Sequence, residues 1–503
     1  MKDFSKGAGT VTLSNATLDQ LPDNIQRPGY DRATLTPGIV HIGLGNFHRA
    51  HQAWYLHRLM QMGQAHDWAI IGAGMRPYDK MMRQKLLAQD CLSSLFSLDP
   101  SGRSAEVIGS MIDYLPVEEG CGPLIACMAD PGIKIVSLTV TEGGYYVDPV
   151  RGGLDETHAD IQHDMANPNQ PRTAFGAIIA ALKQRRTAGH GPFTVQSCDN
   201  LQGNGRITRQ VICALARGSD PDLAEWISQH ASFPNSMVDC IVPATGPDEL
   251  ALAQQFGVAD QVPVTHEPYR QWVIEDDFCA GRPEWEQVGA TLTGDVHDFE
   301  AMKIRLLNAG HQVLANAGEL LSVTSISGCM THPQISGLFS KVAHEEIAPH
   351  VASVPDTTPQ AYIDLISERF SNPAILDTTR RVAFDGVSRH GGFILPTLRD
   401  ALAAGGQVRG LALVEALWAR MCAGTREDGS VIVPNDPIWD RLQNTALDAK
   451  ASPRIWLGMQ DIYGDLANRA SFAEPFDAWL NMLWNEGVLA TLDCYLSESP
   501  VLG

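Results

Sequence analysis

A short apolar run followed directly by a glycine turn and a helix is the feature that most constrains the fold of this chain. Residues 38–42 have the composition of a buried strand, Gly43 and Gly45 follow at the G-x-G spacing, and an amphipathic helix comes next. In this context glycines let the backbone approach a pyrophosphate, which then lies at the helix N-terminus. The segment predicts a dinucleotide-binding turn. Because His48 replaces the third glycine of the usual pattern, an ordinary tight turn remains an alternative.

Three further apolar runs predict the rest of a sheet. Residues 68–74, 133–140 and 193–198 have buried-strand composition, and residues 171–186 have a helical pattern. Alternating strands and helices are typical of a doubly wound, mostly parallel sheet. We therefore expect an α/β fold with a Rossmann-type domain.

Polar residues follow three of these strands, at the sheet edge where ligands bind in such folds. Glu142 and Asn200 follow two of them, and Asp79 comes shortly after residues 68–74. An aspartate there accepts hydrogen bonds from the adenosine ribose and favours NAD, whereas Arg76 opposes that preference. The alternatives are an Asx turn for Asn200 and a helix N-terminal charge for Asp79.

Length and pattern together predict two domains. A chain of 503 residues is too long for one ordinary core. From about residue 298 strands nearly vanish, and helical periodicities follow at residues 362–370, 410–421, 454–466 and 476–496. We place the boundary near residue 295. This gives a dinucleotide-binding domain over 1–295, with 1–37 as an irregular arm, and a mostly α-helical substrate and catalytic domain over 296–503, with a catalytic cleft between them.

The helix expected over residues 302–321 carries a group of chemically useful side chains. Asn308 and His311 are three residues apart and share a face of an α-helix. Lys303 lies about 80° from His311 in projection. An amine, an amide and an imidazole suit proton removal from a hydroxyl whose oxygen gains charge. The alternative is a solvated lysine and a core histidine.

The chain lacks the residues that other dehydrogenase mechanisms and serine hydrolase mechanisms require. His48 with His51, and His344 with its neighbouring glutamates, have no Cys/His cluster beside them, so we expect no catalytic metal. No tyrosine has a lysine four residues later, and no G-x-S-x-G elbow is present. A metal-free hydride transfer with Lys303 as base remains.

Composition limits the partners and the location. The net charge of -21 argues against nucleic acid and anionic membranes, which require a basic face. No apolar run is long enough to span a membrane, and the first residues lack the apolar core of a signal peptide. The ten scattered cysteines form no CxxC pair, so we expect a cytoplasmic protein.

Four segments together resemble the mannitol 2-dehydrogenase family, the polyol-specific long-chain dehydrogenases. They are residues 43–51, residues 139–145, residues 197–200 and the Lys303, Asn308 and His311 set. The resemblance covers roughly residues 35–490. It implies a metal-independent, reversible oxidation of a secondary alcohol of a sugar alcohol to a ketose with NAD, in a monomer or a small homo-oligomer.

The resemblance also implies individual roles. Lys303 resembles the general base, and Glu300 resembles the carboxylate that passes the proton to water. Asn200 and Asn308 resemble the oxyanion hole, and His311 the group that binds and orients the reacting oxygen. Asp239, Arg381 and Arg389 correspond to substrate-binding positions. The implied cofactor-binding residues are Gly43, Gly45, Asn46, Phe47, Arg49, Asp79 and Glu142.

Two departures from the family pattern leave alternatives open. Arg389 stands where mannitol dehydrogenases carry a lysine, and Tyr78 precedes Asp79 where an acidic residue is expected. Since Arg389 could bind a carboxylate, a hexuronate reductase acting on fructuronate or tagaturonate, with mannonate or altronate as product, is an alternative to a mannitol enzyme. A D-arabinitol dehydrogenase and a nucleotide-sensing protein without catalysis are the others.

Overall fold

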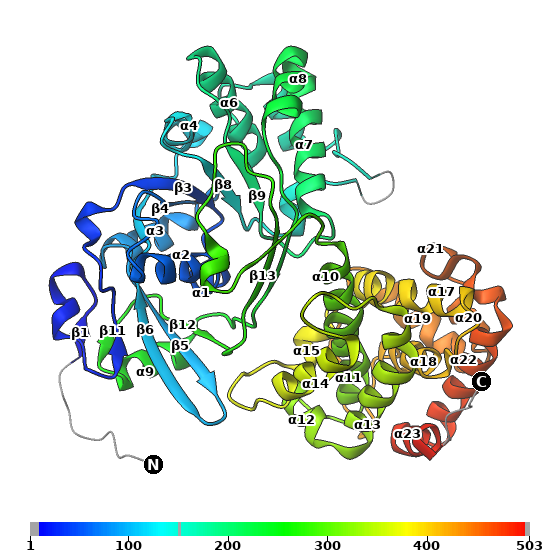
Figure 1. Cartoon of the computed structure of the whole chain (residues 1–503). Coiled ribbons are helices and arrows are strands. Elements are labelled where there is room, and N and C mark those ends of the chain that lie inside the picture. Colours follow the sequence, from blue (N-terminus) through cyan, green and yellow to red (C-terminus); the bar gives the residue numbers. More distant parts are fainter. Residues whose placement is uncertain (1–9, 149–151, 498–503) are drawn as a thin grey trace. The chain divides into compact units, whose positions relative to one another are not determined.

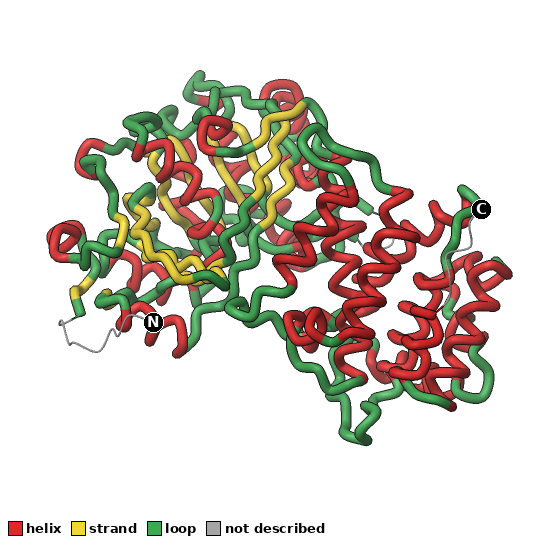
Figure 2. Tube along the Cα trace, turned by 60° about the horizontal axis from the view of Figure 1, so that its bottom comes forward, coloured by secondary structure: helices red, strands yellow, loops and turns green. Residues whose placement is uncertain are grey.

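The computed structural model describes residues 10–148 and 152–497, and its internal contacts divide the chain into two compact units. Unit 1 is Met1–His297 and unit 2 is Asp298–Gly503. In Figure 2 the strands belong to one unit, and the other is built of helices and loops. The predicted fold class, a Rossmann-type α/β domain followed by a mostly helical domain, is confirmed.

Unit 1 is organised around a five-stranded parallel sheet (Figure 1). Its strands, in spatial order, are β7 (Met111–Tyr114), β4 (Ala69–Ala73), β3 (Pro37–Ile42), β8 (Ile135–Leu138) and β9 (Thr194–Ser197). All four neighbouring pairs are parallel. Numbered along the chain the order is 3-2-1-4-5, so the direction of winding reverses between β3 and β8, where such sheets bind ligands.

Both faces of this sheet are buried, which explains the apolar composition of its strands. Val40 and Ile42 of β3 belong to one core cluster, whereas Ile39 belongs to another. This alternation follows the two-residue period of a strand. The first cluster includes residues of α4, α6, α7 and α8, and the second includes residues of α2.

Up to residue 296, the α-helices of unit 1 are α1 (Asn46–Ala50), α2 (Gln52–Gln61), α3 (Asp79–Leu87), α4 (Gly122–Ala129), α5 (Ala159–Ala166), α6 (Ala174–Thr187), α7 (Asn204–Ser219), α8 (Pro221–His230) and α9 (Pro247–Gln255).

Smaller sheets complete unit 1, and they correct the prediction of an irregular N-terminal arm. Strands β1 (Val11–Thr12) and β2 (Ile25–Gln26) of the arm pair in parallel with later strands. Beyond the large sheet the strand orders are β1-β11, β10-β13-β14 and β12-β5-β6-β2. The remaining strands are β5 (Ser93–Asp99), β6 (Gly102–Ile108), β10 (Ser236–Asp239), β11 (Val258–Ala259), β12 (Val264–His266), β13 (Gln271–Glu275) and β14 (Thr291–Thr293).

Unit 2 is helical, and two predicted long helices are broken. The pattern over residues 476–496 forms two helices because Gly487 adopts a φ of 87°, a left-handed conformation that ends a helix. The pattern over 454–466 forms three short pieces. From the start of unit 2 the α-helices are α10 (His297–Met302), α11 (Ala309–Leu320), α12 (Ile326–Thr331), α13 (Pro333–Val342), α14 (Pro359–Phe370), α15 (Thr379–Val382), α16 (Gly386–Arg389), α17 (Leu395–Ala403), α18 (Arg409–Cys422), α19 (Trp439–Ala449), α20 (Arg454–Leu457), α21 (Gln460–Tyr463), α22 (Ala470–Asn485) and α23 (Val488–Ser497).

A wholly buried polar network lies within unit 2. The two carboxylate oxygens of Glu415 bond to His390 Nδ1 and to the Tyr463 hydroxyl, each at 2.7 Å. Trp456 donates its indole N–H to the Tyr463 oxygen at 2.6 Å, and Asn316 Nδ2 lies 3.0 Å from His390 Nε2. These five residues come from five helical segments. Because all five are buried, the hydrogen bonds that connect these segments are shielded from water.

Replacing Glu415 with alanine is expected to destabilise unit 2 by about 3–5 kcal/mol, because His390 and Tyr463 would keep buried donors without an acceptor. Urea unfolding at neutral pH measures the change. Glu345→Ala removes an exposed glutamate of the same unit and is the matched control. Equal unfolding midpoints for the two variants would contradict the role of the network.

Candidate active site

A cavity of about 570 Å³ opens around the glycine turn of unit 1. Gly43 has a φ of 92°, and a Cβ there would lie 2.1 Å from the Thr139 carbonyl oxygen, so only glycine fits. Gly45 precedes α1 as its N-cap residue, with open space where a Cβ would lie. The turn therefore leaves the space and the backbone donors that a phosphate group requires. Residues lining the cavity include Gly43, Gly45, Met75, Arg76, Asp79, Thr141, Gly144, His158, Asp160 and Arg172.

The carboxylate of Asp199 holds one wall of this cavity in place. It accepts hydrogen bonds from the backbone N–H groups of Val140 (3.0 Å) and Thr141 (2.9 Å), and from the Tyr145 hydroxyl (2.7 Å). Burial raises the pKa of Asp199, while these three donors oppose the rise. Asp199 thus links the loop after β8 to the end of β9, where the exposed Asn200 follows directly.

Asp79 lines the same cavity as the first residue of α3. Its Oδ2 accepts hydrogen bonds from the backbone N–H groups of Met75 (2.9 Å) and Arg76 (2.8 Å). The carboxylate therefore orders the loop after β4. Its position also agrees with the alternative role considered for Asp79, a negative charge that stabilises the N-terminus of a helix.

Four residues expected at the cofactor do not line this cavity. Arg49 is fully buried; its guanidinium contacts the carbonyl oxygens of Gly45 and Val262 and bonds to Asn46 Oδ1 at 2.7 Å. Burial lowers the pKa of Arg49 to about 10. Asn46 Nδ2 donates to the Pro243 carbonyl and to the Thr245 hydroxyl, Phe47 stacks on His51, and Glu142 is exposed. Of these four residues, Arg49 supports the turn directly, through its contact with the Gly45 carbonyl oxygen.

His48, which replaces the third glycine, packs against the sheet. Its ring stacks on His41 of β3, with centroids 3.4 Å apart and an angle of 13° between the planes. The third glycine of a dinucleotide turn allows the helix to approach the strand closely. Here two flat, stacked rings fill that contact.

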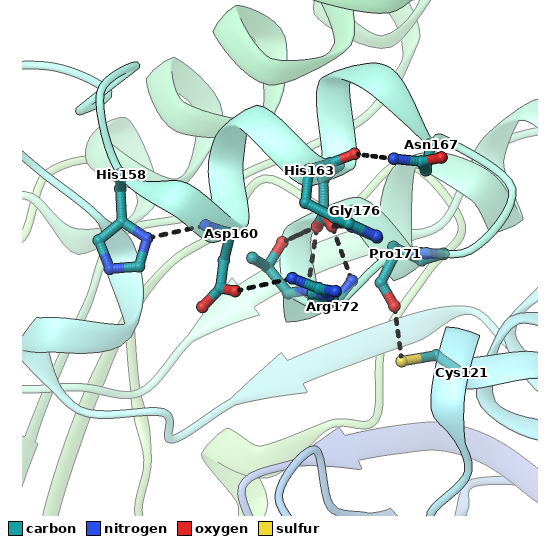
Figure 3. A network of polar contacts seen from close by, with 10 residues as sticks. Cys121, His158, Asp160, His163, Asn167, Pro171, Arg172 and Gly176 are labelled. Carbon is teal, nitrogen blue, oxygen red and sulfur yellow. Dashed lines mark hydrogen bonds and ion pairs between the residues drawn. The ribbon is translucent and has the colours of Figure 1, made fainter.

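The cavity also has a polar rim that the sequence analysis missed. Figure 3 shows Asp160 beside Arg172, with a nitrogen–oxygen distance of 4.0 Å, and the ring of His158 accepting a hydrogen bond from the Asp160 backbone. His158, Asp160 and Arg172 lie 13 or more residues beyond the motif at residues 139–145, and the chain's path through α5 brings them to the cavity.

In unit 2, Lys303 opens a π-helical turn, and this corrects the prediction of one regular α-helix over 302–321. The turn is η6 (Lys303–Asn308), between α10 and α11. Among residues 152–497, two other such turns occur, η7 (Ala343–Ile347) and η9 (His390–Ile394). Because a π turn bonds residue i to i+5, the projected angle between Lys303 and His311 derived for an α-helix does not apply. Such turns occur frequently at functional sites.

The expected catalytic residues of unit 2 all lie on this interrupted helix. The side chains of Glu300 and Lys303 are buried, with 5% and 8% of their surface exposed. Asn308 ends the π turn and is half-buried, as is His311 in α11. A buried lysine is uncommon, so Lys303 differs from the solvated lysine of the alternative interpretation.

His311 has a neighbour that the sequence analysis did not identify. Its ring stacks on Phe370 with centroids 4.3 Å apart, and its Nε2 lies 3.9 Å from Asp377 Oδ2. This Nε2 is buried and makes no hydrogen bond with any described residue. Burial lowers the pKa of His311 to about 4, with Asp377 opposing and Arg381, Arg369 and Arg389 reinforcing the effect, so the imidazole is neutral at pH 7.

Asp377 also binds Arg381 and could have been found in the sequence. Arg381 Nε and one terminal nitrogen donate to the two Asp377 oxygens at 2.7 Å each. The Asp377 side chain is 7% exposed and that of Arg381 60%. The two residues are four apart in the sequence, with Asp377 just before α15 and Arg381 within it.

The other two expected substrate residues have different surroundings. Arg389 donates to the Val382 carbonyl at 3.0 Å, a carbonyl that also accepts a hydrogen bond from Gln312 of α11 at 3.1 Å. Asp239 is buried at the end of β10 in unit 1. The structure therefore brings His311 and Arg381 together at Asp377.

Residues 10–148 and 152–497 lack two kinds of feature. They contain no group of three or more His, Cys, Asp or Glu side chains placed to hold a metal ion. None of their helices has both the length and the apolar character needed to cross a membrane.

Comparisons with known proteins agree over nearly the whole chain. Residues 37–287 match the mannitol dehydrogenase Rossmann domain, and residues 295–484 match the mannitol dehydrogenase C-terminal domain. The mannitol 2-dehydrogenase of Cereibacter sphaeroides is 55% identical over 474 residues, covering 94% of this chain and 99% of that protein. That of Phaeosphaeria nodorum is 39% identical, covering 97% and 86%.

Solved structures lead to the same family. The Pseudomonas fluorescens mannitol 2-dehydrogenase, in a ternary complex with NAD and D-mannitol, has 39% identity and a TM-score of 0.87, over 97% of this chain and 100% of the other. A D-sorbitol dehydrogenase in substrate-free form has 34% identity and a TM-score of 0.88, over 95% and 100%. The resemblance found in the motifs is confirmed. The chain belongs to the mannitol dehydrogenase family.

Proposed function

We propose that this protein catalyses the reversible oxidation of mannitol to fructose with NAD, without a metal and with Lys303 as the general base. Family membership makes the chain an NAD-dependent polyol dehydrogenase. Mannitol is supported by the 55% identical relative of that name and by the solved relative with NAD and D-mannitol. The observation that carries the mechanism is the burial of Lys303 at the start of a π turn that ends at Asn308, with His311 following in α11.

Each residue of the helix has a proposed task in this reaction. Lys303 takes the proton of the substrate hydroxyl, a role that requires an uncharged amine, and removal from water favours the uncharged form. Glu300, three residues earlier and also buried, relays that proton to solvent. Asn308 donates a hydrogen bond to the oxygen as charge builds on it, and His311 orients the substrate.

Residues of unit 1 bind the cofactor and complete the oxyanion donors. NAD, when bound, accepts the hydride from the substrate carbon. The cavity at Gly43, Gly45 and Asp79 would hold the dinucleotide, because the turn offers backbone donors for its phosphates. Asn200 is proposed as the second amide donor to the developing alkoxide. Asp239 and the cations Arg381 and Arg389 are proposed to bind other substrate hydroxyls.

A substrate panel tests the proposed function. NADH formation is followed with mannitol, D-arabinitol, sorbitol and mannonate as the reductant and NAD as the oxidant. The proposal predicts the highest kcat/KM for mannitol. A higher value for mannonate would replace the proposal with the hexuronate reductase, and NADH binding without turnover of any substrate would favour a nucleotide-sensing protein.

Replacing Asn200 with alanine is expected to lower kcat by about 10²–10³-fold, the usual effect of removing one oxyanion donor. The Kd for NADH should change much less, because the donor acts on the substrate oxygen. Asn169→Ala, at an exposed position of unit 1, is the control. A variant that loses NADH affinity while keeping its kcat would contradict the oxyanion role.

A further inference from the structure

We propose that Asp377 makes the substrate site select uncharged polyols over sugar acids, an inference that rests on the proposed function. The residue lies between two groups assigned to the substrate. Its carboxylate binds Arg381 through both oxygens, and its Oδ2 faces His311 Nε2 at 3.9 Å. It is thus a negative charge placed where a substrate would meet the imidazole.

The first effect of Asp377 is to occupy Arg381. A guanidinium presents a planar fork of N–H groups that matches a carboxylate, and an arginine with 60% of its side chain exposed could receive one from a substrate. Here the Nε edge of that fork is already filled by Asp377. The N–H groups that remain can donate to neutral hydroxyls, but the charge of Arg381 is balanced.

The second effect is a place for one hydroxyl. An oxygen can lie about 2.8 Å from both His311 Nε2 and Asp377 Oδ2, since the two atoms are 3.9 Å apart. A hydroxyl there accepts a hydrogen bond from the N–H of a neutral imidazole that carries its hydrogen on Nε2, and it donates its own hydrogen to the Asp377 carboxylate. The buried Nε2, which has no hydrogen-bond partner among the described residues, is then satisfied. Stacking on Phe370 fixes the imidazole plane for this contact.

The same place rejects a carboxylate. A carboxylate has no hydrogen to donate to Asp377, and two like charges at this distance repel. The bridged hydroxyl keeps its proton, because a neighbouring carboxylate opposes charge on its oxygen. This contact therefore assigns His311 to a hydroxyl beside the reacting one, in place of the reacting oxygen that the resemblance implied. Arg369 and Arg389 remain near His311 in either case, so a change at position 377 isolates the charge of Asp377.

The experiment compares kcat/KM for mannitol and for mannonate, with NAD, in wild type and Asp377→Asn. The ratio of mannonate to mannitol should rise by about tenfold or more, because the variant removes the repelling charge and releases Arg381. The double variant Asp377→Asn/Arg381→Gln should show a smaller gain, because Arg381 is no longer present to bind the carboxylate. Glu346→Gln, which alters a buried carboxylate bonded to the Gly410 and Leu411 backbone, should leave the ratio unchanged. An unchanged ratio in Asp377→Asn would overturn the proposal.

A measurement on the wild type keeps the test independent of variant folding and of turnover. Calorimetry on the enzyme–NADH complex compares D-mannonate with D-mannonamide, which has the same skeleton without the charge. The amide should bind at least about tenfold more tightly. Equal affinities would overturn charge selection even if mannitol is oxidised. Absence of mannitol oxidation, with the amide still preferred, would overturn the proposed function alone.

Discussion

Replacing Lys303 with alanine is expected to lower kcat for mannitol oxidation by about 10²–10⁴-fold, the range that general base catalysis supplies. The Kd for NADH should stay close to the wild-type value, because the residue lies in unit 2 and the glycine turn and its cavity lie in unit 1. Stopped-flow or steady-state NADH formation measures the first quantity, and NADH fluorescence titration the second.

Two companion variants make this result specific. Lys303→Arg keeps the positive charge and much of the length, but a guanidinium does not give up its proton in a protein, so it should be as slow as alanine. Lys450→Ala removes an exposed lysine of the same unit and should keep full activity. An active Lys303→Arg enzyme would show that position 303 supplies charge and packing instead of a base.

The protein is expected to lose several kcal/mol of stability as the pH falls from about 7.5 to about 5.5. Burial lowers the pKa of His41, His57 and His266 to about 3 and that of His311 to about 4. In the unfolded chain each takes up a proton near pH 6.5. Between these pH values the unfolded state binds more protons than the folded state. The free energy of unfolding therefore decreases as the pH decreases, by up to about 1.4 kcal/mol per pH unit for each histidine.

Two carboxyl groups oppose this trend. Burial raises the pKa of Asp199 and of Glu346, so these groups shift stability in the opposite sense. Urea unfolding at a series of pH values gives the slope. His41→Gln should lower the slope by about one proton, because it removes one of the four groups. A stability that is constant or rises toward pH 5.5 would contradict the assignment of neutral, buried histidines.

The sheet and its glycine turn could be predicted because their signals are local. A strand buried on both faces is rich in apolar residues, as Ile39, Val40 and Ile42 show in β3, and Gly43 adopts a conformation that other residues rarely take. The Lys303, Asn308 and His311 set was found by spacing and by resemblance. Their burial agrees with a site, and their catalytic roles stay predictions.

What the sequence did not reveal depends on distant contacts. Lys303 starts a π turn although nothing in residues 302–310 differs from a regular helix pattern, because packing of the whole unit decides such a distortion. Asp199 and Asp377 orient other functional residues through hydrogen bonds that only the folded chain forms. Arg49 looked like a cofactor ligand because it lies in the motif, yet its guanidinium is enclosed by protein atoms.

The most direct test of the central claim is the stoichiometry and rate of mannitol oxidation by enzyme that has been dialysed against a strong chelator. If a lysine amine alone removes the hydroxyl proton, the treated enzyme should form one fructose for each NADH at the untreated rate. Loss of turnover that returns on addition of Zn²⁺ would contradict it, because a metal ion would then be supplying the activation assigned to Lys303.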